Sequence, residues 1–202
     1  MKTFNEIDVT AKRASKAAGF SWGVAEEIGK NIRLLEVLGL PGIKNLNQYF
    51  KIYKKQQFQN ISLITKFNTS KISYCPIIVG VNLLDQITVM EELDEINFEN
   101  VAFPVLIIPF LSRASEIIGK KIMLVIDDQK FLLNFNQSIY SNYSFKTIIE
   151  KAKKIKINFL ENTNSFSEND WEDLCKLTED TFVEETEELK QKTAGAGLID
   201  ND

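Results

Sequence analysis

Apolar residues recur at helical spacing along the first quarter of the chain, and each run begins at a residue suited to start a helix. Thr3 is followed three residues later by Glu6, which is the spacing of a capping box. Ser21 is a suitable N-cap for the second run, and Pro41 opens the third. The pattern therefore predicts a helical subdomain over residues 1–57, with helices over 3–19, 21–38 and 41–54.

Short runs rich in isoleucine and valine replace the helical spacing in the middle of the chain, and turn residues separate them. The Asp-Asp-Gln-Lys segment at 127–130 predicts a hairpin between two of these runs, and a short helix is expected over 112–119. The predicted strands cover residues 72–81, 101–108, 121–126, 131–135 and 155–160. They predict a central sheet, mixed or mainly antiparallel, over residues 58–165.

The last part of the chain returns to helical spacing. Ser167, with Asp170 three residues later, is expected to cap a helix whose apolar face includes Trp171 and Leu174. We assign residues 166–202 to this C-terminal helix and to an ordered tail that folds back. The chain is therefore expected to form a single domain, 1–202, of the α+β class.

The composition and charge of the chain indicate which classes of partner and which cellular compartment to expect. The 202 residues carry a net charge of −4, so no basic excess is present to neutralise nucleic-acid phosphates. The longest apolar run, 101–111, is too short to span a membrane, and the first residues lack the apolar core of a signal peptide. Two cysteines do not make a disulfide framework. We expect a cytoplasmic protein that binds neither nucleic acid nor membrane.

The sequence contains no histidine, which removes several chemistries. Ser-His-Asp and Cys-His catalysis, histidine-ligated metal sites and imidazole general bases are excluded. No segment has the glycine spacing of a P-loop or of a dinucleotide-binding fingerprint. Any proton transfer must therefore use Asp, Glu, Lys, Tyr, Cys or water.

The second predicted helix carries the best-defined candidate site. At 100° per residue, its core stripe consists of Val24, Ile28, Ile32, Leu35 and Leu38. A second stripe lies nearly opposite and consists of Trp22, Glu26, Gly29 and Arg33. A glycine there costs about 1 kcal/mol relative to alanine, which suggests close approach of a backbone or a ligand. Two interpretations stay equal: a surface that receives a ligand, or an exposed face on which Glu26 pairs with Lys30 or Arg33.

The chain closes on Ala-Gly-Ala-Gly-Leu-Ile-Asp-Asn-Asp, residues 194–202, which is the second candidate. Its backbone amides are expected to form an anion-receiving nest, and its acids supply hard oxygens that suit Mg²⁺ or Ca²⁺. Pairing of the tail carboxylates with Arg33 or Arg113 is favoured over a metal site. The tail residues expected to take part are Gly195, Gly197, Asp200 and Asp202.

Three residues stand out near the predicted strands. Cys75 precedes a proline at a strand edge, where a thiolate nucleophile would need a base or a helix N-terminus. Without histidine, a buried structural cysteine is favoured. Asp85 ends the same segment, and its carboxylate is expected either to cap a helix or to bind a ligand. Arg113 directly follows an apolar run and is suited to neutralise a carboxylate of the tail or of a substrate.

At these patches the chain resembles an uncharacterised bacterial family, the domain-of-unknown-function family numbered 3726. The resemblance rests on four patches of the sequence. They are Gly-x-x-Trp-Gly-x-Ala-Glu-Glu-x-Gly at 19–29 with a following Arg33, a Cys-Pro-Ile-x-x-Gly segment that ends in Asp at 75–85, Pro-x-Leu-x-x-Pro-Phe-Leu-x-Arg at 104–113, and the closing motif at 194–202. The family carries no established activity. The resemblance implies that the tail belongs together with Trp22, Glu26, Arg33 and Arg113.

Function is predicted only at the level of class. The leading hypothesis is a protein that binds a small anionic metabolite, or an enzyme that works without histidine, with the C-terminal tail in its site. Arg33 and Arg113 would hold the anion beside Trp22, and Glu26 or Asp200 would move a proton. The alternative is a non-catalytic interaction subunit whose tail docks a second copy in a homo-oligomer, or a partner enzyme. The sequence identifies no cofactor.

Overall fold

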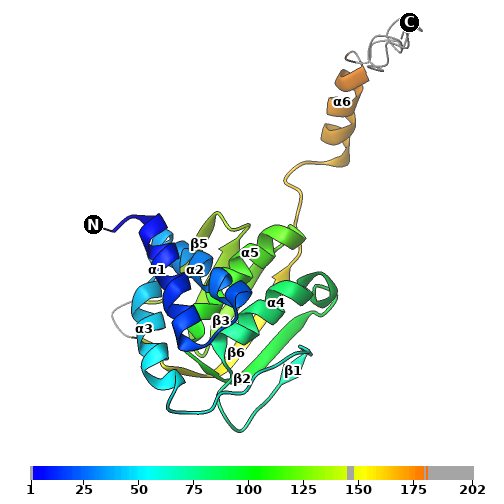
Figure 1. Ribbon diagram of the computed structural model, residues 1–202. Helices are drawn as coiled ribbons and strands as arrows, with labels where there is room; N and C mark the ends of the chain where they lie inside the picture. Colours follow the sequence, from blue (N-terminus) through cyan, green and yellow to red (C-terminus); the bar gives the residue numbers. More distant parts are fainter. Residues whose placement is uncertain (1, 145–147, 180, 182–202) are drawn as a thin grey trace, which may run out of the picture. The chain divides into compact units, whose positions relative to one another are not determined.

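The computed structural model describes residues 2–144, 148–179 and 181. The chain divides into two compact units, residues 1–162 and 163–202. Figure 1 shows the helices of the first unit on one side of its sheet, so this unit has two layers.

The three predicted N-terminal helices are confirmed. Thr3 and Glu6 form the expected capping box, and Gly19 ends the first helix in the left-handed conformation, with φ 111°. The Ser21 hydroxyl accepts a hydrogen bond from the backbone N–H of Val24 at the start of the second helix. The helices are α1 (Phe4–Ala18), α2 (Trp22–Val37) and α3 (Gly42–Tyr53).

The prediction of a strand over 72–81 is wrong, because this segment begins helix α4 (Pro76–Met90). Pro76 lies in the first turn, where its fixed φ suits a helix and its missing N–H leaves no bond unmade. The apolar residues that resembled a strand are buried in the helix layer, among them Ile77, Val79, Leu83 and Ile87. A helix that is apolar on most sides has little polar face to reveal its period.

The predicted strand over 101–108 is wrong beyond its first two residues. Strand β2 (Glu95–Ala102) ends before Phe103, whose φ of 40° turns the chain away from the sheet. A short 3-10 turn, η1 (Pro104–Ile107), leads into helix α5 (Ile108–Ile118), which confirms the helix expected over 112–119 and starts it earlier. Prolines near the start of both elements favour helical turns over a strand.

In the described residues, six strands form one sheet in the order β1-β2-β6-β3-β4-β5. β1 and β2 are parallel and the other neighbours are antiparallel, so the mixed sheet and the α+β class are confirmed. The remaining strands are β1 (Phe67–Asn68), β3 (Lys121–Ile126), β4 (Gln129–Asn134), β5 (Ser138–Ser141) and β6 (Lys151–Leu160). β3 has the predicted bounds, β4 and β6 match predicted strands with shifted ends, and the short β1 and β5 were not predicted.

One face of the sheet supplies the core beneath the helices. A row of paired residues crosses four neighbouring strands, and every member is fully buried: Ile96, Ile157, Leu124 and Phe131. On the other face, Glu99 is paired with Lys154, and Lys156 lies 2.5 Å from Glu95 in an ion pair. This alternation is typical of an antiparallel sheet with one solvated face.

Helices α4 and α5 pack closely because α4 has a glycine where α5 approaches it. A Cβ on Gly80 would lie only 2.2 Å from a ring carbon of Phe110. Arg113 lies three residues beyond Phe110 on the same helix, and its guanidinium reaches Glu27 of α2. The close α4–α5 contact thus fixes where Arg113 lies relative to α2 and α4.

The second unit contains helix α6 (Glu168–Glu179), and the predicted cap is present. The Ser167 N–H donates to the Asp170 carboxylate at 2.8 Å, and the Asp170 N–H donates to the Ser167 hydroxyl at 3.2 Å. None of the residues of α6 is buried. The candidate tail, residues 194–202, lies outside the described residues. Within the ranges that are described, no helix combines the length and apolar character that a membrane crossing requires.

Candidate functional site

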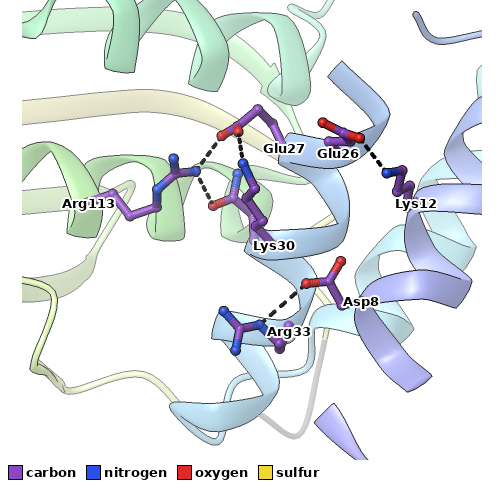
Figure 2. Close-up of polar contacts among 8 residues, drawn as sticks. Asp8, Lys12, Glu26, Glu27, Lys30, Arg33 and Arg113 are labelled. Atoms are coloured by element: carbon purple, nitrogen blue, oxygen red, sulfur yellow. Dashed lines mark hydrogen bonds and ion pairs between the residues drawn. The ribbon is translucent and has the colours of Figure 1, made fainter. Parts of the chain in front are cut away.

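The stripe predicted on α2 lies against helix α1, and Figure 2 shows Glu26 and Arg33 of this stripe pointing toward α1 residues. Arg33 Nε lies 3.5 Å from Asp8, and Glu26 forms an ion pair with Lys12. Two ammonium groups of α1 lie over the exposed Trp22 ring. The Lys12 Nζ is 5.9 Å and the Lys16 Nζ is 5.4 Å from the ring centroid. All three predicted side chains therefore contact α1.

Gly29 lies in the middle of this stripe and is buried. A Cβ at this position would meet the Asp8 carbonyl oxygen at 2.8 Å and the Asp8 carboxylate at 2.6 Å. The glycine therefore allows close approach of a backbone, one of the two possibilities that its position suggested. The partner of the stripe is a neighbouring helix, and Glu26 pairs with Lys12 instead of Lys30 or Arg33.

A second face of α2 holds an ion-pair cluster that the sequence did not predict. Glu27 accepts hydrogen bonds from Arg113 Nη1 at 2.5 Å and from Lys30 at 2.8 Å. Burial raises the pKa of Glu27, but the hydrogen bonds from Lys30 and Arg113 outweigh it and hold that pKa below its usual value. Glu27 is therefore ionised at neutral pH and fixes Arg113 in place.

Asn31 completes the support of Arg113. Its side chain is 2% exposed, and its Oδ1 lies 3.3 Å from Arg113 Nη1. Both hydrogen bonds thus use the same guanidinium nitrogen. Among the described residues, Nε and Nη2 of Arg113 have no hydrogen-bond partner, and Nδ2 of Asn31 has none either. One edge of the guanidinium is held by the protein and the other remains available.

Arg113 and Glu27 line an open cleft of about 530 Å³ on the first unit. Its walls come from the first turns of α2, from α4 and from α5. The lining residues are Ser21, Gly23, Val24, Glu26, Glu27, Val81, Leu84, Asp85 and Arg113. A volume in the range of roughly 300–1,000 Å³ is usual for small-molecule pockets.

The predicted site residues are divided among three places. Glu26 and Arg113 both line the cleft, and the structure adds Asp85, which the sequence left open between capping and binding. Trp22 and Arg33 contact α1 and do not line the cleft. The tail residues Gly195, Gly197, Asp200 and Asp202 lie outside the described residues, as do the proposed nest and its pairing with arginine.

Cys75 does not belong to this cleft. It is the N-cap residue of α4, not a strand-edge residue, and it is buried as favoured from the sequence. Burial raises the pKa of its thiol, while the Tyr49 hydroxyl 3.0 Å from Sγ acts in the opposite direction without reversing the shift. The thiol therefore remains protonated at neutral pH, as expected of a structural cysteine.

The first unit is thus a two-layer α+β structure. Its cleft has a volume in the range of small-molecule pockets and is lined by an arginine that Glu27 and Asn31 hold in place. A family model described as "Protein of unknown function (DUF3726)" matches residues 2–74 and confirms the resemblance over that part of the chain. The match covers α1, α2, α3 and β1, whereas Asp85 and Arg113 lie beyond it. No curated protein and no solved structure matches the chain.

Proposed function

We propose that this protein binds a small molecule in the cleft between α2, α4 and α5, with an anionic group of the ligand on Arg113. One observation carries the proposal: the guanidinium is held through Nη1 by Glu27 and Asn31, and its Nε and Nη2 edge has no partner among the residues that the structure describes. A carboxylate or phosphate can accept two parallel hydrogen bonds from such an edge.

The environment of Arg113 strengthens such an interaction. The Arg113 and Glu27 side chains are only 26% and 24% exposed, so water screens the site less than an open surface. The guanidinium is already oriented, so binding costs less side-chain entropy than it would for a free arginine. Val24, Val81 and Leu84 supply apolar wall beside it.

An enzymatic version of the proposal assigns proton transfer to Glu26, which lines the same cleft. A hydrogen bond from Lys12 and its positive charge lower the pKa of Glu26, so this carboxylate is ionised at neutral pH, the form that accepts a proton. The expected contributions of Gly195, Gly197, Asp200 and Asp202 stay predictions. They are tested by comparing ligand binding of the full chain with that of a chain ending at Thr193.

The decisive experiment compares two arginines. Wild type, Arg113→Gln and the matched control Arg33→Gln are titrated with acetate, pyruvate, succinate and inorganic phosphate, using calorimetry and thermal unfolding. We expect at least one anion to bind wild type and Arg33→Gln equally, and to bind Arg113→Gln about 10-fold to 100-fold more weakly. Circular dichroism verifies that each variant is folded, and Arg113→Lys keeps the charge if the glutamine variant unfolds. Equal binding by all three proteins would contradict the proposal.

A second candidate function, interaction with a partner chain, is favoured by α6. Three apolar side chains of this helix are at least half exposed: Trp171 at 50%, Leu174 at 57% and Leu177 at 65%. They lie within about one third of the helix circumference, the form of a helix that docks into an apolar groove. Sedimentation of wild type and Leu174→Ser over a concentration series tests whether this face joins two copies. A monomer in both cases argues against self-association through α6.

A further inference from the structure

The charges that line the cleft are unequally satisfied. Glu26 is paired with Lys12, and Glu27 is paired with both Lys30 and Arg113. Asp85, the remaining charged residue of the lining, is exposed and has no counter-ion or hydrogen-bond donor for its carboxylate among residues 2–144, 148–179 and 181. The cleft thus offers a ligand one available cationic edge and one available carboxylate.

The two available groups come from different helices that border the same space. Asp85 lies on α4, and Arg113 lies on α5, which packs against α4 at Gly80. Val81 and Leu84, one turn and one residue before Asp85, line the cleft and are half-buried. A ligand on Arg113 that extends toward α4 therefore meets apolar side chains and a carboxylate.

This arrangement discriminates among ligand charges. A simple anion on Arg113 would be repelled mainly by Asp85, because the other two lining carboxylates, Glu26 and Glu27, are paired with cations of the protein. A simple cation would satisfy Asp85 and leave the free edge of Arg113 unused. A compact molecule with both charges satisfies both groups and adds no net charge to the cleft.

We propose that the ligand is a small zwitterion of the amino-acid type. Its carboxylate binds the Nε and Nη2 edge of Arg113, its ammonium group pairs with Asp85, and an aliphatic side chain packs on Val81 and Leu84. This inference rests on the proposed function and specifies its ligand class.

A matched set of three probes tests the ligand class. L-leucine carries both charges, N-acetyl-L-leucine carries only the carboxylate, and L-leucinamide carries only the ammonium group. We expect wild type to bind leucine at least about 10-fold more tightly than either derivative, since each derivative loses one charge-assisted contact. The other amino acids are screened in parallel by ligand-observed NMR. Failure of every free amino acid to bind, or equal binding of leucine and N-acetyl-leucine, overturns the inference.

Variants separate this inference from the proposed function. In Asp85→Asn, leucine binding should fall about 10-fold while N-acetyl-leucine binding stays equal or improves, because a repulsive carboxylate has been removed. The control Glu92→Gln removes an exposed carboxylate outside the cleft lining and should change neither. Arg113→Gln should weaken both ligands. If Asp85→Asn leaves the preference for leucine unchanged, the zwitterion class is wrong. Loss of anion binding in Arg113→Gln would still support the proposed function.

Discussion

Glu26 and Glu27 are neighbours in the sequence and both line the cleft, yet they pair with different helices (Figure 2). Glu26 reaches α1 and pairs with Lys12, in a contact between helices that are adjacent in the chain. Glu27 reaches α5 and pairs with Arg113, which lies 86 residues further along. The first contact joins two adjacent helices, whereas the second holds an arginine that lines the cleft and whose Nε and Nη2 have no partner among the described residues.

A conspicuous residue pattern and an available chemical group are therefore different things in this protein. The Trp22, Glu26 and Arg33 stripe looks functional in the sequence, but its charges already have partners on α1. The less conspicuous Glu27 holds a guanidinium whose remaining donors are free among the described residues. Candidate sites are better ranked by unmet hydrogen-bonding capacity than by residue type.

The largest expected effect on the α1 side comes from filling the space at Gly29. Gly29→Leu should lower the free energy of unfolding by about 2–3 kcal/mol, because its Cβ would meet the Asp8 carbonyl oxygen and force the helices apart. The control is Gly23→Ala, where the added Cβ has no neighbour within 4 Å. Urea denaturation measures both. A Gly29→Leu protein as stable as wild type would show that α1 and α2 are not packed this closely.

The second effect tests the cleft side. Glu27→Gln should lower the unfolding free energy by about 1–2 kcal/mol, since the largely covered Arg113 loses its charged partner. Glu26→Gln should produce no resolvable change, because the Glu26 pair is solvent-exposed. Urea denaturation of the two variants side by side gives the contrast directly. Equal destabilisation would show that the Glu26–Lys12 and Glu27–Arg113 pairs contribute alike to stability.

The third effect is a pH dependence with a defined sign. Hydrogen bonds from Lys30 and Arg113 hold the pKa of Glu27 in the folded chain below its ordinary value of 4.5, so the folded state favours the ionised carboxylate. Its contribution to stability is complete above about pH 4.5 and is lost as the pH falls through the folded pKa. Urea denaturation between pH 7 and pH 3 should therefore show a steeper acid loss for wild type than for Glu27→Gln. Parallel curves would mean that Glu27 titrates alike in both states.

The smallest effect concerns Trp22. Trp22→Leu removes the ring beneath the Lys12 and Lys16 ammonium groups and keeps apolar bulk. We expect a loss of about 0.5–1 kcal/mol, in line with cation–π contacts at exposed positions. The loss should shrink in Lys16→Gln, measured as a double-mutant cycle by thermal unfolding. Additive losses would show that the contact contributes nothing to stability.

Local signals made much of the fold predictable. The capping box at Thr3, the N-caps at Ser21 and Ser167, and the left-handed Gly19 are short-range chemistry, and the structure contains all of them. Helix α4 was missed because its burial depends on neighbours far along the chain, so its apolar residues show no helical period. The proline after Cys75 was the signal that could have revealed it.

The site was predictable only in part, for a similar reason. Periodicity correctly placed Trp22, Glu26 and Arg33 on one face, but it does not reveal what that face contacts. Arg113 was singled out because a charge following an apolar run needs a partner. That partner, Glu27, could not be identified from spacing, since only the tertiary fold brings α5 to α2. Asp85 could be assigned to the candidate site only from the structure, which shows that it lines the same cleft as Arg113.

The position of β6 has a consequence for synthesis on the ribosome. This strand lies between β2 and β3, so it joins the β1–β2 pair to the β3-β4-β5 meander. Until residues 151–160 have emerged, the eight residues of β2 have an open edge, and Ile96 lacks its neighbour Ile157. The nascent chain therefore exposes an open strand edge and apolar side chains until β6 has been made. Chaperone protection matters most during this interval.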